Sequence, residues 1–139
     1  VLDNLIEDGF VPVVATVAAG DDGGSFNVNA DLVAGEIAAA LGADKIIFLT
    51  DVDGLYKDFS DKSSLISALS ANEAREMIMN DELEGGMVPK VAACMKAVDN
   101  GVRRAHILNG TVQHALLLEV YTDEGVGTMI ADDANQEGH

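Results

Sequence analysis

Short, almost wholly apolar runs alternate with segments of helical spacing, and this alternation leaves few folds open to the chain. Phe10 to Ala18, Lys45 to Thr50 and Ala105 to Leu108 are rich in Val, Ile, Leu and Ala. Such runs are typical of strands buried on both faces, as in parallel sheets. Leu32 to Leu41 and about Val88 to Asn100, which lie between them, have the apolar spacing of helices. Strand, helix, strand, helix, strand predicts right-handed crossovers and therefore an α/β fold with a parallel sheet.

The stretches outside these runs predict shorter elements. Val1 to Gly9 has the pattern of the end of an amphipathic helix stopped by glycine, so the chain begins in the middle of an element. Ser70 predicts a helix start, because Glu73 completes a capping box with it. The further expectations are a hairpin loop at Gly20–Ser25, an irregular segment at Phe59–Ser64, a short helix at His114–Leu118 and an edge strand at Gly127–Ala131. We expect one domain over residues 1–131 and a polar tail over residues 132–139.

The charge balance restricts the partners. The chain has 24 acidic and 8 basic residues, a net charge of -16. Such a surface repels a nucleic-acid backbone and an anionic membrane. No apolar run approaches the ~18 residues of a membrane span, and the N-terminus lacks the basic and apolar regions of a signal peptide. The net charge, the lack of a membrane span and the lack of a signal peptide together lead us to expect a cytoplasmic protein without a nucleic-acid or membrane partner.

Cys94 is the lone cysteine and lies in an apolar stretch, so we expect it to be buried.

Polar side chains cluster just before and at the start of the helix predicted over Leu32–Leu41. Asn27, Asn29 and Asp31 occupy alternating positions there, just after a predicted buried strand. Free backbone N–H groups at a helix N-terminus attract anions. A helix cap by Asn29 or Asp31 explains part of the same pattern. Both interpretations stay open at this point.

Two further motifs indicate a site at the carboxyl ends of the strands, where parallel sheets bind ligands. Thr50 and Asp51 open the loop Thr50-Asp51-Val52-Asp53-Gly54-Leu55-Tyr56, although an Asp-Gly turn needs no ligand to explain it. Gly85-Gly86-Met87-Val88-Pro89-Lys90 combines paired glycines with a lysine in the first turn of a helix. A lysine there can hold phosphate oxygens, and the alternative is an exposed surface lysine.

Together these motifs resemble the amino-acid kinase family, in Thr50-Asp51-Val52-Asp53-Gly54-Leu55-Tyr56 and Gly86-Met87-x-x-Lys90 above all. The resemblance implies a three-layer αβα sandwich with a mainly parallel sheet, of which this chain would be the C-terminal, nucleotide-binding half. It also implies roles for single residues. Asp31 would organise the catalytic lysines, and Lys90 would stabilise the transferring phosphoryl group. Thr50, Asp51 and Met87 would bind ATP or ADP, with Mg²⁺ bridging the phosphates.

Three narrower segments resemble the family members that phosphorylate the γ-carboxylate of N-acetyl-L-glutamate. They are Asn27–Asp31, Ala105–Gly110 and Leu118–Thr128. The first implies that Asn27 contacts the acyl amino acid. The last two imply a feedback site for L-arginine at His106, Glu119, Gly125 and Gly127, in a homo-oligomer. A glutamate 5-kinase or another sister kinase, and a non-catalytic module that binds nucleotide or arginine, stay open as alternatives.

Overall fold

The computed structural model describes residues 1–83, 86–122 and 125–132. In chain order the elements are α1 (Leu2–Glu7), β1 (Val17–Ala19), β2 (Ser25–Asn27), α2 (Ala30–Ala40), β3 (Lys45–Thr50), the 3₁₀ helix η1 (Lys62–Ser64), β4 (Ala68–Ser70), α3 (Ala71–Met79), α4 (Met87–Asp99), β5 (Arg104–Asn109), α5 (Ala115–Tyr121) and β6 (Thr128–Ala131). The expected tail beyond residue 132 and Gly85 of the paired glycines lie outside the described residues.

A four-stranded sheet in the order β3-β5-β6-β4 forms the centre of the fold. β3 runs parallel to β5, with Lys45 opposite Arg104 and Thr50 opposite Asn109, and β4 runs parallel to β6. Only the β5–β6 pair is antiparallel, so the prediction of a mainly parallel sheet is confirmed. β6 was expected at an edge, and that prediction is wrong: it lies inside the sheet because β4, which the sequence pattern did not reveal, pairs with its outer side.

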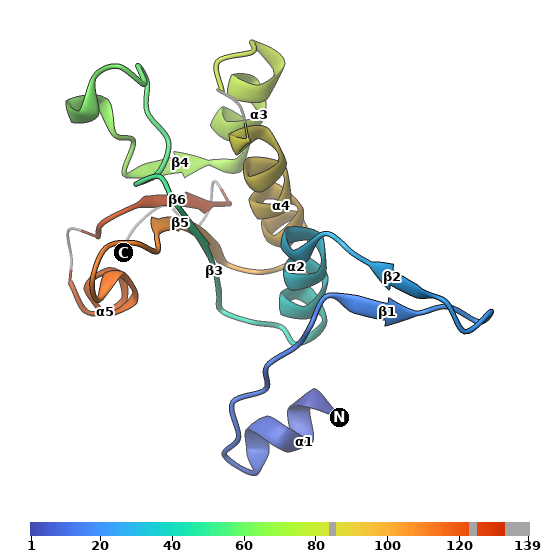
Figure 1. Ribbon diagram of the computed structural model, residues 1–139. Helices are drawn as coiled ribbons and strands as arrows, with labels where there is room; N and C mark the ends of the chain where they lie inside the picture. Colours follow the sequence, from blue (N-terminus) through green and yellow to red (C-terminus); the bar gives the residue numbers. More distant parts are fainter. Residues whose placement is uncertain (84–85, 123–124, 133–139) are drawn as a thin grey trace.

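Helices cover both faces of this sheet (Figure 1). α4 packs against the sheet between α2 and α3, while α5 packs on β5 from the opposite side. The alternation along β5 explains both contacts, since Ala105 and Ile107 join the apolar core with α4, and His106 faces α5. Cys94 lies in that core as expected, and burial raises the pKa of its thiol far above the ordinary range. The three-layer arrangement is therefore confirmed.

The predicted helix ends are also present. Ser70 caps α3 through a full capping box, in which the Glu73 N–H donates to Ser70 Oγ and the Ser70 N–H donates to Glu73 Oε2. Asn29 caps α2 by accepting a hydrogen bond from the Leu32 N–H at 3.1 Å. Gly9 follows α1 with a φ of 82°, in the left-handed region that favours glycine. These ends are local in sequence, which is why residue types alone predict them.

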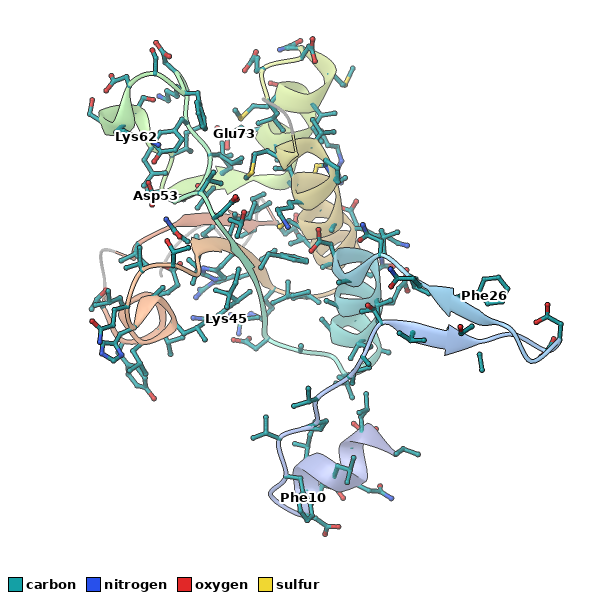
Figure 2. The ribbon with its side chains drawn as sticks, viewed as in Figure 1. Phe10, Phe26, Lys45, Asp53, Lys62 and Glu73 are labelled. Atoms are coloured by element: carbon teal, nitrogen blue, oxygen red, sulfur yellow. The ribbon has the colours of Figure 1, made fainter. Side chains whose placement is uncertain are left out.

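The prediction of a buried strand over Phe10–Ala18 is wrong. Only Val17–Ala19 is a strand, and it pairs with Ser25–Asn27 in an exposed hairpin. Phe10 is 63% exposed, and Figure 2 shows it on a segment away from the four-stranded sheet. Between Phe10 and Thr16 no strand partner is present among the described residues, and Pro12 has no N–H to offer one. Apolar composition therefore predicted the burial of a segment that has no partner here.

Candidate functional site

The first turns of two helices bring a lysine and an aspartate together. α2 and α4 pack side by side, and Asp31 and Lys90 lie in their N-terminal turns. Lys90 Nζ donates to Asp31 Oδ2 at 3.3 Å, and each side chain is 24% exposed. Lys90 is thus a partly buried lysine with an ion-pair partner. The cap of α2 is Asn29, and Asp31 does not have that role. The result is a partly buried cation held beside a helix N-terminus.

A cavity of about 270 Å³ opens directly on Lys90. It lies between the carboxyl end of β3 and the start of α4, where α4 has Gly86 as its N-cap. Its lining residues are Thr50, Asp51, Val52, Phe59, Gly86, Met87 and Lys90. A second cavity, of about 310 Å³, continues along the loop after β3 and shares Phe59 and Met87 with the first. Four residues singled out from the sequence, Thr50, Asp51, Met87 and Lys90, thus line one cavity.

The loop that follows β3 is fixed at several points. The Gly110 N–H donates to the Thr50 carbonyl at 2.8 Å. The Leu55 N–H donates to Thr128 Oγ1 at 2.8 Å, and Gly54 lies so close that a Cβ there would be 2.5 Å from the same oxygen. Glycine is needed at position 54 for this contact. The loop is therefore held against β5 and β6.

Asp53 accepts hydrogen bonds from two side chains on different elements. Asn109 Nδ2 donates to Asp53 Oδ1 at 2.8 Å, and Tyr56 Oη donates to Asp53 Oδ2 at 2.6 Å. These bonds, that of Asn109 first, lower the pKa of the Asp53 carboxyl. The same contact raises the pKa of the buried Tyr56 phenol to about 12, because it favours the protonated form.

Asn27 stands apart from this arrangement. It is the exposed last residue of β2 and is separated from α2 by two residues. It is not among the lining residues of either cavity. Its expected contact with a substrate stays a prediction.

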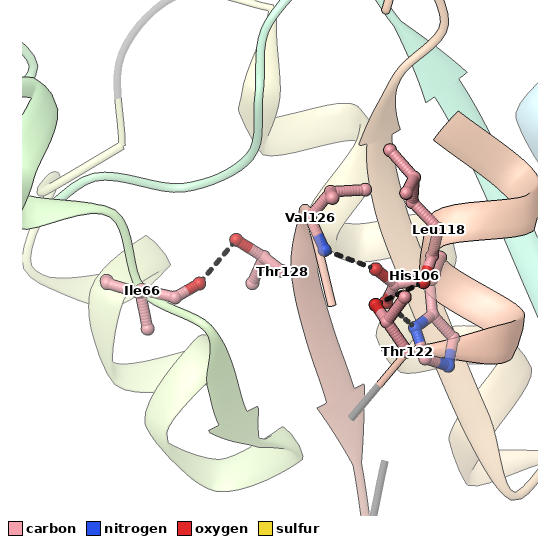
Figure 3. A network of polar contacts seen from close by, with 7 residues as sticks. Ile66, His106, Leu118, Thr122, Val126 and Thr128 are labelled. Carbon is pink, nitrogen blue, oxygen red and sulfur yellow. Dashed lines mark hydrogen bonds and ion pairs between the residues drawn. The ribbon is translucent and has the colours of Figure 1, made fainter. Parts of the chain in front are cut away.

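His106 on β5 and Glu119 on α5 form a buried pair on the face of the sheet that α5 covers. Figure 3 shows His106 among the polar contacts of this region. His106 Nδ1 lies 2.6 Å from Glu119 Oε1, and the Val126 N–H donates to Glu119 Oε2 at 2.7 Å. The residues are 1% and 4% exposed, so Glu119 does not lie on the helix surface. His106 Nε2 has no hydrogen-bond partner among the described residues. The pair joins β5, α5 and the segment before β6.

The two glycines expected near this pair differ in what they do. Gly125 has a φ of 61°, in the left-handed region. Gly127 lies against the Ile107 carbonyl and the Leu108 side chain, so a Cβ there would have no room. Gly127 therefore permits a close approach of two chain segments and leaves no open space of its own.

Sequence patterns missed Phe59, Val52 and the side chains that hold Asp53. Phe59 stands in a segment expected to be irregular, yet its ring meets Tyr56 edge-on at 5.8 Å between centroids and lines both cavities. Lys62 Nζ lies 4.6 Å from the Tyr56 ring centroid. A signal was present, because aromatic residues are only 4% of the chain and two of them stand three positions apart.

The arrangement can bind an anion. The cavity offers a lysine ammonium, the start of a helix and a threonine at the end of a parallel strand. Phosphate oxygens are suited to such a site, because a helix N-terminus and an ammonium both stabilise negative charge. No described helix has the length and apolarity to cross a membrane. Fold and site thus describe an α/β protein with a cavity at the strand ends whose lining suits a small anionic ligand.

Comparison with known proteins narrows this class. The model of the amino acid kinase family matches residues 1–109, and the chain belongs to that family. It is 55% identical over 130 residues to an acetylglutamate kinase of Nostoc punctiforme, covering 94% of this chain and 44% of that protein. An acetylglutamate kinase of Thermoanaerobacter is 51% identical over 133 residues, with 96% and 44% covered. The chain thus spans less than half the length of these curated relatives.

The solved structures include an N-acetylglutamate synthase of Neisseria gonorrhoeae. In complex with coenzyme A and N-acetyl-glutamate it has a TM-score of 0.86 and 28% identity, covering 95% of this chain and 30% of that chain. In complex with coenzyme A and L-arginine it has a TM-score of 0.83 with the same identity and coverage. Similar folds thus occur in proteins whose names describe different reactions.

Proposed function

We propose that the chain is the nucleotide-binding half of an ATP-dependent kinase that phosphorylates the γ-carboxylate of N-acetyl-L-glutamate, a step of arginine biosynthesis. The observation that carries the proposal is the Lys90–Asp31 pair at the cavity of Thr50, Asp51 and Met87. Identity of 51–55% to acetylglutamate kinases over nearly the whole chain supports the choice of substrate.

In this proposal Lys90 neutralises charge on the γ-phosphoryl group as it is transferred. Phosphoryl transfer depends on positioning and on charge stabilisation, with little covalent help from the protein. Asp31 keeps the lysine ammonium at the cavity, and Thr50, Asp51 and Met87 hold the nucleotide. Asn27, at the end of β2 and separated from α2 by two residues, contacts the acyl amino acid in this proposal.

Magnesium fits this site as a companion of the nucleotide. No group of three metal-binding side chains is present among the described residues, whereas Asp51 is an exposed carboxylate at the cavity. Mg²⁺ is commonly held by one or two carboxylates together with substrate phosphates. When bound, the ion would offset phosphate charge, and Asp51 is the residue of the cavity that would face it.

The test compares two lysines of one helix. Lys90→Ala should weaken the binding of ATP to this chain, measured by calorimetry, because the γ-phosphate loses its cation. Lys96→Ala is the matched control, since Lys96 lies on α4, is about half exposed and pairs with Glu36. Equal ATP affinity in both variants and the parent would overturn the assignment of the site.

The substrate is tested on a chain extended to the length of the curated relatives. Turnover with N-acetyl-L-glutamate is expected, and none from the 139 residues alone. Phosphorylation of glutamate, aspartate or carbamate in its place would favour a sister kinase. Nucleotide binding without turnover in the extended chain would favour a binding module.

We also propose an L-arginine site at His106, Glu119, Gly125 and Gly127, in which Gly127 sets the course of the chain by packing against Ile107 and offers the ligand no space of its own. The supporting observation is the buried His106 Nε2, which has no described partner and can accept a hydrogen bond when Nδ1 donates to Glu119. A guanidinium carries the donors that such an acceptor and a carboxylate take up. Calorimetry with arginine should show binding that Glu119→Gln weakens and the exposed Glu36→Gln leaves unchanged. Equal affinity in both variants contradicts the site.

A further inference from the structure

Asp53 connects two strand ends that border the cavity. Thr50 and Asn109 are the last residues of β3 and β5 and stand opposite each other in the ladder. Three residues after Thr50, the chain has turned so that the Asp53 carboxylate meets the Asn109 amide. The residues between them, Asp51 and Val52, line the cavity. Any shift of Asp53 therefore moves a wall of the cavity.

The orientation of the Asn109 amide is determined by its other end. Asn109 Oδ1 accepts from the Thr111 N–H at 2.9 Å and from Thr111 Oγ1 at 2.6 Å. The oxygen is thus occupied by two donors, and Nδ2 is left to face Asp53. An amide turned by half a rotation would place its oxygen against the Asp53 carboxylate and its NH₂ group against the Thr111 N–H. It would lose both of those bonds and could pair only with the Thr111 hydroxyl, which can also accept.

From Asp53 the contacts continue to a second wall. Tyr56 donates its hydroxyl to Asp53 and presents its ring to Phe59, which lines both cavities. Lys62 Nζ lies over both rings, 4.6 Å from the Tyr56 centroid and 5.1 Å from that of Phe59. Figure 2 shows Asp53 and Lys62 on the same side of the molecule. One carboxylate thus links the Asp51–Val52 wall to the Phe59 wall.

We propose that Asn109 and Tyr56 are positioning residues that hold the Asp53 carboxylate from two sides and so keep the Asp51–Val52 and Phe59 walls of the cavity in place for a nucleotide. Asn109 lines neither cavity, and Tyr56 lines only the second, so toward the cavity of Lys90 each acts through a neighbour. The part of the inference that concerns the nucleotide rests on the function proposed above, whereas the part that concerns the loop does not.

The proposal is tested by exchanging donor and acceptor. Asn109→Asp places a carboxylate against Asp53 and should release the loop. Adding Asp53→Asn restores a donor–acceptor pair of reversed direction: the amide at position 53 donates to the carboxylate at position 109, whose other oxygen still accepts from Thr111. The Tyr56 hydroxyl then donates to the oxygen of the new amide. The double variant should therefore recover what the single variant loses.

Two measurements follow the loop. Hydrogen–deuterium exchange of the amides of residues 51–55 should accelerate in Asn109→Asp and return to the parent rate in the double variant, with exchange in α3 unchanged. ADP affinity should fall roughly tenfold or more in the single variant and recover in the double one. Tyr56→Phe keeps the ring against Phe59. It should therefore show a smaller acceleration of loop exchange and a smaller loss of ADP affinity than Asn109→Asp.

A spectroscopic readout reports on the Tyr56–Asp53 bond itself. The chain has two tyrosines and no tryptophan, so Tyr121→Phe leaves Tyr56 as the single phenol in the absorbance titration. Its midpoint of about 12 should fall toward the ordinary 10.0 when Asp53→Asn removes the carboxylate. Asn109→Asp retains the carboxylate and should not lower the midpoint.

The possible results separate the two proposals. If the parent chain binds no ADP, the proposed nucleotide function fails. Hydrogen–deuterium exchange of the loop and the absorbance titration of Tyr56 then still decide whether Asn109 and Tyr56 hold Asp53. Parent-like loop exchange in Asn109→Asp, or no recovery in the double variant, overturns the inference. Normal ADP affinity in a variant whose loop exchanges freely overturns its link to the nucleotide.

Discussion

Thr128 illustrates how much a single buried hydroxyl contributes. It is fully buried at the start of β6, where it accepts from the Leu55 N–H at 2.8 Å and donates to the Ile66 carbonyl at 2.6 Å. Thr128→Val preserves shape and leaves both backbone groups unpaired, each at about 1–3 kcal/mol. We expect the free energy of unfolding, measured by urea titration, to fall by about 2–6 kcal/mol.

The control is Thr122→Val. Thr122 is exposed, and its hydroxyl donates to the Leu118 carbonyl within α5. Water can satisfy that carbonyl when the hydroxyl is removed, so we expect a change within about 0.5 kcal/mol. Equal effects of the two substitutions would show that the Thr128 hydroxyl does not connect the loop to β6 as described.

Tyr56 makes the stability of the chain depend on alkaline pH. Its folded pKa of about 12 lies above the ordinary 10.0, so the folded state holds its proton more tightly than the unfolded state. The contribution to stability is complete below pH 10.0 and is lost as the pH rises toward about 12. Urea titrations across this window should show a fall that is shallower in Tyr56→Phe. A parallel fall in both proteins would contradict the Asp53–Tyr56 bond.

Some residues of the candidate site can be predicted from short sequence motifs, and others depend on contacts between distant parts of the chain. Asp31, Thr50, Asp51, Met87 and Lys90 were predicted because their motifs stand at element ends, and helix starts and strand ends follow from short patterns. The contacts of Asp53 with Asn109 span 56 positions in sequence. Periodicity carries no information on such pairs, since the strand order and register decide them.

At the scale of elements, the close approach of the segment before β6 to β5 depends on Gly127. A Cβ there would meet the Ile107 carbonyl, which is backbone and cannot turn aside. We expect Gly127→Ala to lower the free energy of unfolding by about 3 kcal/mol or more, measured by urea titration. Gly86→Ala is the control, because nothing lies within 4 Å of a Cβ at that position. A mild effect at Gly127 would show that β6 can shift away from β5.

The same scale shows where sequence patterns predict elements and where they do not. The runs Lys45–Thr50 and Ala105–Leu108 are strands because they pair with each other. Phe10–Ala18 has a similar composition, yet most of it pairs with nothing among the described residues. β4 was missed because Ala68–Ser70 is too short for alternation to appear. Propensity predicts the readiness to pair, while pairing itself depends on distant segments.

For the whole molecule, the dominant electrostatic feature is self-repulsion. Acidic residues exceed basic ones by 24 to 8, so most carboxylates cannot have a basic partner. The exposed pairs Arg75–Asp99, Lys96–Glu36 and Arg103–Asp44 are each worth roughly 0–1 kcal/mol. Salt weakens these pairs and also weakens the repulsion, and the excess of like charges makes the second effect larger.

Added sodium chloride should therefore stabilise the chain at pH 7. We expect the free energy of unfolding to rise by about 1 kcal/mol between ~0.01 M and ~0.3 M salt, because the Debye length shortens from about 30 Å to less than 10 Å. The matched control is the same series near pH 4.1, the isoelectric point, where repulsion is small and salt should have no effect or a slightly destabilising one. A loss of stability with salt at pH 7 would mean that the attractive pairs outweigh the net charge of -16.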